Sequence, residues 1–124
     1  MVSPAAGQRW RYNTPPGFES SRIVVGALIT FSEHEPVVCC AVEHAAQRMP
    51  TGTLDRVTIP FLPMTQSAFL DTVTSQDGVG AVPEAFARHY ASWREDLRGL
   101  SYFTVPFPGF MDKMIALQMQ QLIS

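Results

Sequence analysis

Apolar and polar residues alternate along the first half of the chain, and this pattern predicts a series of β-strands. The alternation occurs in four segments: residues 8–14, 21–31, 37–45 and 56–61. Side chains two residues apart share a face of a strand, so each segment has an apolar face. Near the start of the third segment, both alternating sets (Val37 and Cys39, Val38 and Cys40) are apolar. This segment is therefore expected to be a central strand that is covered on both faces.

A strand is predicted to pass directly into a helix near the middle of the chain. Ile59 and Phe61 share one side of this strand, and Pro60 between them indicates a sheet edge or a bulge, because proline cannot donate to a neighbouring strand. Thr65 is expected to cap the helix that follows. The helix is predicted to close at Asp77-Gly78.

The second half of the chain is predicted to be mostly helical. A stripe of apolar residues recurs at intervals of three and four: Val82, Phe86, Tyr90, Trp93 and Leu97. This spacing is typical of a helix with one buried face. A last strand is expected at residues 100–105 and a final helix at residues 110–123.

Together these elements predict an α+β fold in which a mainly antiparallel sheet of four to five strands has three helices packed on one face. Residues 1–7 are expected to form a disordered tail, and residues 8–124 a single domain. The predicted core is formed by residues from most of the elements: Ile23, Val25, Ile29, Val38, Cys40, Ile59, Phe61, Phe86, Tyr90, Trp93 and Phe103.

Composition and charge narrow the class of protein. A chain of 124 residues with a net charge of −2 is long enough for one core and lacks the basic excess of a nucleic-acid-binding protein. The two cysteines are adjacent, so they are poorly placed to pair with each other and no disulfide framework is expected. Neither a signal peptide nor a membrane-spanning run is recognisable. A soluble, cytoplasmic protein that binds neither nucleic acid nor membrane is therefore predicted.

The opening of the chain has a pattern that extends beyond its hydrophobicity. It reads Gly7-x-x-Trp10-x-Tyr12-x-Thr14-x-Pro16-Gly17-x-Glu19-x-Ser21. This resembles the opening of a group of small uncharacterised bacterial proteins, which later carry a strand that runs into a helix and then a helix with a Y-x-x-W motif. Tyr90-x-x-Trp93 matches that motif, whereas Val57–Phe61 only approximates the preceding segment. The group has no known activity, so the resemblance supports the order of elements and assigns no functional residue.

Several residue combinations suggest chemistry, but each has a simpler structural interpretation. Glu33-His34-Glu35 offers metal ligands, yet three adjacent side chains at a turn do not easily converge on an ion. Arg9-Trp10-Arg11-Tyr12 resembles a platform for single-stranded nucleic acid, but strand alternation places the aromatic rings inside and the arginines outside. Cys39-Cys40 has no basic neighbour and is best explained as buried core. No catalytic residue, metal site or cofactor is assigned.

Two hypotheses for function remain. In the first, the protein is a non-enzymatic interaction or accessory domain that forms a homodimer or binds a protein partner. Its contact residues would come from the methionine-rich final helix: Phe110, Met111, Met114 and Met119. Intramolecular packing explains this helix equally well. In the second, a small-molecule-binding protein or enzyme has a pocket between sheet and helices, lined by residues from several elements: His44, Arg56, Tyr90 and Trp93.

Overall fold

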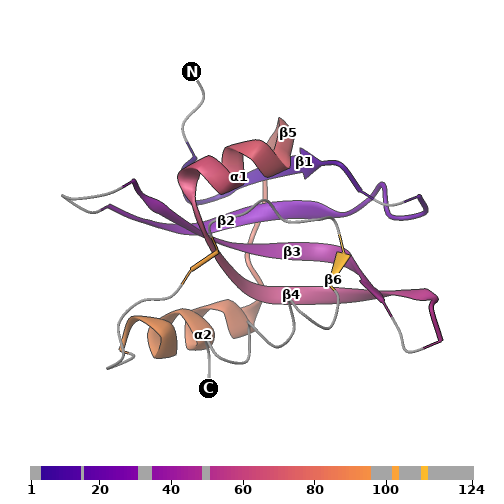
Figure 1. Ribbon diagram of the computed structural model, residues 1–124. Helices are drawn as coiled ribbons and strands as arrows, with labels where there is room; N and C mark the ends of the chain where they lie inside the picture. Colours follow the sequence, from indigo (N-terminus) through magenta and orange to yellow (C-terminus); the bar gives the residue numbers. More distant parts are fainter. Residues whose placement is uncertain are drawn as a thin grey trace.

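The computed structural model describes residues 4–14, 16–30, 35–48, 51–95, 102–103 and 110–111 (Figure 1). Their helices and strands are β1 (Gln8–Tyr12), β2 (Arg22–Ile29), β3 (Val37–Arg48), β4 (Leu54–Thr65), α1 (Gln66–Thr72), β5 (Val73–Val79), α2 (Glu84–Arg94) and β6 (Phe110–Met111).

Five of the strands form one antiparallel sheet, in the order β4-β3-β2-β1-β5. The first four strands are neighbours in the order of the chain, and β5 returns to pair with β1 at the far edge. The short strand β6 lies parallel to β3, with Ala46 opposite Phe110, beyond Glu43, which pairs with Arg22 at the start of β2. The predicted α+β class and antiparallel sheet are confirmed.

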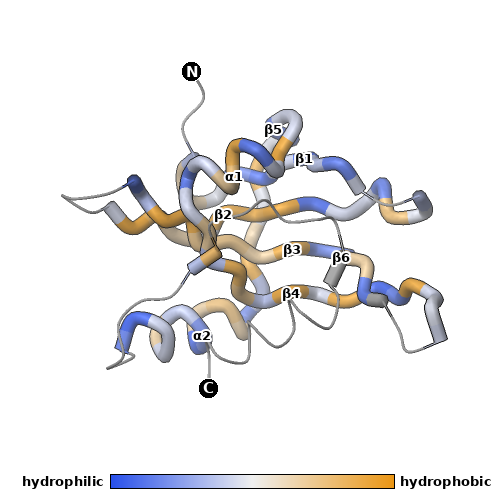
Figure 2. The backbone as a smooth tube through the Cα atoms, viewed as in Figure 1, coloured by the Kyte–Doolittle hydropathy of each residue, from blue (hydrophilic) through white to orange (hydrophobic). Residues whose placement is uncertain are grey.

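The sheet is covered on both faces, and each face has its own apolar cluster. Val38, Cys40 and Val42 of β3 point to one side, where Phe69 of α1 packs. The intervening residues of β3 point to the other side, where Phe86 and Trp93 of α2 pack. Figure 1 shows α1 and α2 on either side of the sheet, and Figure 2 shows that apolar residues dominate the middle of β2, β3 and β4. The central position of β3 is confirmed, but the prediction that all helices share one face is wrong.

The number of helices also differs from the prediction. The described residues contain two α-helices, not three. The third was predicted over residues 110–123, but Phe110 and Met111 are the strand β6. The rest of that segment, including Met114 and Met119, lies outside the described residues.

The junction between sheet and helix is tied down at two points. Thr65 is the N-cap of α1, as predicted, and its hydroxyl accepts a hydrogen bond from the Ala68 N–H at 3.2 Å. Glu35, from the turn before β3, accepts a second one from the Ser67 N–H at 2.6 Å. Both acceptors satisfy N–H groups that have no partner within the first helical turn.

The helix after this junction is shorter than predicted. It ends at Thr72, and Val73 is already extended, with φ −83° and ψ 153°. The following residues form β5, where a helix was expected to continue to Asp77-Gly78. The β-branched pair Val73-Thr74 favours an extended chain, and pairing with β1 satisfies its backbone.

A bulge in β4 reverses the direction of one large side chain. Leu62 pairs with Cys40 and Ile59 pairs with Val42, so β4 has one residue more than β3 in this interval. Ile59 therefore belongs to the cluster under α1, whereas Phe61 belongs to the cluster under α2. Pro60 was predicted to mark a sheet edge or a bulge, and both are found: β4 is at the end of the strand order and has a bulge. The prediction that Ile59 and Phe61 share a face is wrong.

The predicted strand at residues 100–105 is described only at Tyr102 and Phe103. Phe103 lies against the outer edge of β4: its N–H donates to the Pro63 carbonyl at 3.0 Å, and its own carbonyl accepts from the Thr65 N–H at 2.9 Å. It thereby forms a parallel bridge to Met64. Pro63 has no N–H, and the position of this missing donor faces the outer side of β4. The pairing of β4 with β3 therefore loses no hydrogen bond.

Candidate functional site

The four residues predicted to line a pocket do not come together. Trp93 is only 1% exposed, and its ring centroid lies 5.4 Å from that of Phe61 and 6.2 Å from that of Tyr90. Arg56 is five positions before Phe61 on the same strand, roughly 15 Å away in extended chain. Tyr90 and Trp93 therefore serve the core under α2, far from Arg56.

Arg56 and His44 lie on adjacent strands near the other end of the sheet, where Arg56 pairs with Ala46, two residues after His44. Arg56 donates from Nη2 to the Gly17 carbonyl at 2.9 Å, and its guanidinium carbon lies 5.5 Å from the ring centroid of Phe18. These contacts hold the loop after β1 against β4. His44 is exposed at a bulge in β3 and has a left-handed backbone, with φ 53°.

The unusual backbone of His44 leads to a stability prediction. A residue with a Cβ costs roughly 1 kcal/mol in the left-handed region, and glycine avoids most of this cost. We expect His44→Gly to raise the free energy of unfolding by about 0.5 kcal/mol, whereas His44→Ala, which keeps the Cβ, brings no gain. Urea denaturation of the two variants measures the difference. A gain in both variants would point to the imidazole and not to the backbone.

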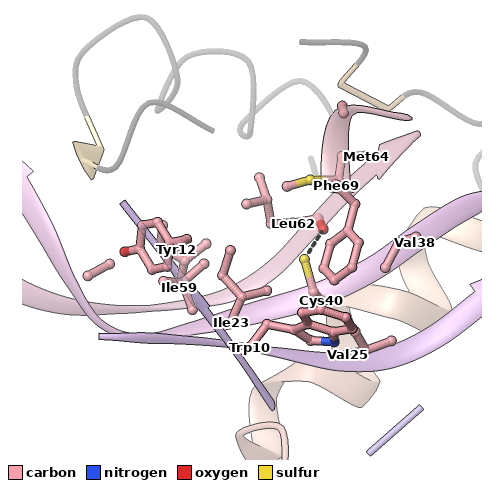
Figure 3. Packing of buried hydrophobic residues seen from close by; sticks show 13 residues of the cluster. Trp10, Tyr12, Ile23, Val25, Val38, Cys40, Ile59, Leu62, Met64 and Phe69 are labelled. Carbon is pink, nitrogen blue, oxygen red and sulfur yellow. Dashed lines mark hydrogen bonds between the residues drawn. The ribbon is translucent and has the colours of Figure 1, made fainter. Parts of the chain in front are cut away.

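Both cysteines are buried thiols, as predicted. Cys39 and Cys40 are fully buried on opposite faces of β3. The Cys40 Sγ–H donates to the Leu62 carbonyl at 3.2 Å (Figure 3). Burial raises the pKa of Cys39 to about 12 and raises the pKa of Cys40 as well. At neutral pH neither thiol supplies the thiolate that a nucleophile needs.

The raised pKa of Cys39 predicts a loss of stability in alkali. The unfolded thiol ionises near pH 9.0, while the folded one keeps its proton up to about pH 12. The protonated Cys39 thiol therefore contributes fully to the free energy of unfolding below pH 9.0. This contribution is lost as the pH rises from 9.0 to about 12, by up to about 1.4 kcal/mol per pH unit. Urea denaturation at several alkaline pH values should show a steeper loss in the wild type than in Cys39→Ala. Equal slopes would contradict the burial of this thiol.

Other potential ligands are dispersed or already engaged. Within the described ranges, no group of three or more histidine, cysteine, aspartate or glutamate side chains is arranged to hold a metal ion. Glu35 of the predicted Glu33-His34-Glu35 turn caps α1, and its two neighbours lie outside those ranges. An open concavity of about 570 Å³ lies beside α2, where its described lining is Glu84, Ala85 and Arg88. These three residues provide no aromatic wall of the kind that ligand pockets usually have.

Among the described residues, three arginines surround one aspartate on the neighbouring strands β2, β1 and β5. Arg22 donates from Nε to Oδ2 of Asp77 at 2.7 Å, and Arg11 donates from Nη2 to Oδ1 at 3.4 Å. Arg9 places its Nη2 3.8 Å from Oδ2 and donates from Nε to the Asp77 carbonyl at 3.1 Å. We call these four residues the arginine cluster.

The arginine cluster carries more positive than negative charge. Three guanidinium groups face one carboxylate, which leaves a surplus of two positive charges (3 − 1). The hydrogen bond from Arg22 is the main reason that the pKa of Asp77 is lowered, and Arg11 adds to it, so the carboxylate stays ionised. The side chain of Arg11 is 56% exposed and that of Arg9 is 38% exposed. Two of the three cations are thus accessible to an anionic partner.

The cluster lies on a part of the sheet that α2 does not cover. Trp10 and Tyr12 point into the core under α1, so Arg9 and Arg11, which alternate with them along β1, point to the opposite face. The apolar cluster under α2 includes no residue of β1 or β5. This exposed direction of Arg9 and Arg11 follows from the alternation in the sequence. The partner Asp77 was missed, because residues 73–79 were expected to end a helix.

Three comparisons with known proteins complete the description. No family model, curated protein or solved structure matches this chain. Neither of the two helices in the described part of the chain is long and apolar enough to cross a membrane.

Proposed function

We propose that this protein is a non-enzymatic interaction domain that binds a protein partner through the end of the sheet that carries the arginine cluster. The observation that supports this function is the surplus of two positive charges around Asp77, on strands that α2 leaves uncovered. Exposed arginines with delocalised charge and several donors are common in protein interfaces.

The surroundings of the other reactive groups support binding over catalysis. The cysteines are buried with raised pKa values, and Arg56 and Glu35 are engaged in structural hydrogen bonds. The alternative, a small-molecule pocket lined by His44, Arg56, Tyr90 and Trp93, is less well supported because Trp93 is buried and Arg56 lies elsewhere on the sheet.

Three further expectations belong to this proposal. The buried free thiols suit a reducing compartment, so we propose a cytoplasmic location. The opening motif supports a relationship to the group of small bacterial proteins that it resembles. Homodimer formation through Phe110, Met111, Met114 and Met119 remains a proposal for a segment whose side chains lie outside the described residues.

A reconstituted complex tests the proposed function. Candidate partners would be captured with the full chain, purified separately and mixed with it, and the mixture examined by native mass spectrometry. A complex of fixed stoichiometry, without any retained small molecule, supports an interaction domain. A chain that forms no such complex but carries a small molecule would overturn the proposal and favour the pocket.

Matched charge reversals locate the binding surface. Arg11→Glu changes the cluster, and Arg88→Glu makes the same change of charge at an exposed position on α2. We expect the complex to be lost with Arg11→Glu and kept with Arg88→Glu. The opposite pattern would place the partner beside α2.

A further inference from the structure

The strand β5 is the outer edge of the sheet next to the arginine cluster. It pairs with β1 on one side, and no described strand pairs with its other side. Thr74, Ser75 and Gln76 are exposed, and Val79 is 78% exposed. An edge strand of this kind presents backbone donors and acceptors to which an extended segment can bind as an additional strand.

Two guanidinium groups of the cluster, those of Arg9 and Arg11, contact a residue of β5. Arg9 and Arg11 belong to β1, but their Nη2 atoms lie 3.8 Å and 3.4 Å from the carboxylate of Asp77, which belongs to β5. Arg9 also donates from Nε to the backbone carbonyl of Asp77 at 3.1 Å, so its guanidinium reaches the backbone of β5. A strand added beside β5 would lie about 4.8 Å further out, within reach of these cations through its own side chains.

The backbone of β5 limits where such a strand can pair. The register against β1 shifts twice, between Val73 and Ser75 and between Gln76 and Val79, and Gly78 in the second interval has a left-handed backbone with φ 75°. Bulges of this kind discourage indiscriminate pairing between sheet edges. The regular and exposed stretch between the two shifts is Ser75–Gln76, and a stretch this short needs additional contacts from side chains to bind selectively.

The charge of the cluster distinguishes among the segments that fit this edge. Two copies of this chain paired through β5 would bring two surpluses of positive charge together, which disfavours a symmetric dimer at this edge. A segment with glutamate or aspartate on alternate residues would instead place its carboxylates on the side of the arginines.

We propose that an acidic, extended segment of a partner protein binds along β5 as an additional strand, with its carboxylates paired to Arg9 and Arg11. This inference rests on the proposed function and specifies its surface and the chemistry of its partner. The backbone of β5 supplies the pairing, and the cluster selects the charge.

Synthetic peptides test this inference without the natural partner. The probe is a short fluorescent peptide of alternating glutamate and valine, and its binding to the full chain is followed by fluorescence anisotropy. We expect saturable binding, no binding of the peptide with lysine in place of glutamate, and about tenfold weaker binding when alternate amides are N-methylated, because methylation removes the donors of the added strand. Hydrogen exchange should slow in β5 when the acidic peptide binds.

Two variants connect the binding to the cluster. Arg11→Glu should weaken binding of the acidic peptide about tenfold, and Arg88→Glu should leave it unchanged. Circular dichroism confirms that both variants are folded. Absence of binding, equal binding of the N-methylated peptide, or equal effects of the two variants would overturn the inference. A wild-type dimer whose formation protects β5 would overturn it as well, in favour of a second copy. If the acidic peptide does not bind while a reconstituted complex forms and is lost with Arg11→Glu, this inference fails and the proposed function stands.

Discussion

Replacing Gly26 with alanine is expected to lower the free energy of unfolding by roughly 3 kcal/mol, because the new methyl group meets a buried ring. A Cβ at this position would lie 2.4 Å from Cζ, 2.6 Å from Cε1 and 2.8 Å from Cε2 of Phe86. The register of β2 against β3 shifts at this glycine, between Val25 and Ala27. The ring of Phe86 thus lies against β2 at a position that has no side chain.

The ring of Phe86 has little room to move aside. It is 5% exposed, its centroid lies 5.6 Å from that of Phe61, and it is stacked on Tyr90 at 5.7 Å. Relief of the clash therefore requires either a displacement of α2 or a distortion of β2. Both changes disturb the close packing of the cluster under α2.

A double-mutant cycle separates this clash from other effects of the substitution. The single variants Gly26→Ala and Phe86→Ala should each be destabilised in urea denaturation, and the double variant should lose clearly less than the sum of the two. Removal of the ring leaves space for the new methyl group. Additive losses would contradict the contact between Gly26 and Phe86 and would place the cost of the substitution in the backbone of β2.

Features that depend on local periodicity were predictable from the sequence. Trp10 and Tyr12 are buried and Arg11 between them is exposed, as alternation along a strand requires. The stripe of apolar residues in α2 packs as its helical spacing predicts, with Phe86 and Trp93 buried. Each of these features needs only the residues within one element.

Features that depend on distant pairing were not predictable. The sides of the sheet on which α1 and α2 pack depend on how the chain crosses after β5, and no short pattern specifies this. The strand β5 was missed because Val73–Val79 includes polar residues and a glycine, and only pairing with β1 gives it a defined structure.

The arginine cluster likewise depends on residues that are distant in the sequence, so it was not predictable from local patterns. Arg9, Arg11 and Arg22 are separated from Asp77 by 68, 66 and 55 positions in the chain. The sequence indicated that Arg9 and Arg11 face solvent but did not indicate which acidic residue they bind. The direction of Phe61 was wrong for a related reason, because the bulge in β4 is defined by its register against β3.

The reversal of Phe61 gives the second large expected effect. Phe61→Ala should lower the free energy of unfolding by about 3–5 kcal/mol, as expected for removal of a buried phenylalanine ring. Phe61 is 1% exposed, and its ring centroid lies 5.4 Å from that of Trp93 and 6.3 Å from that of Tyr90. Urea denaturation at constant m-value measures this loss.

Milder substitutions at the same site determine which face of the sheet Phe61 occupies. Phe61→Leu and Trp93→Phe should be coupled by about 0.5–1 kcal/mol, because the two rings are in contact. Ile59→Val and Trp93→Phe should be additive within about 0.5 kcal/mol, since Ile59 packs under α1 on the opposite face. If Ile59 and Phe61 were equally coupled to Trp93, the two side chains would share a face, and β4 would have the regular alternation predicted from its sequence. If only Phe61 is coupled to Trp93, the bulge lies between Ile59 and Phe61, and α2 packs on the face opposite α1.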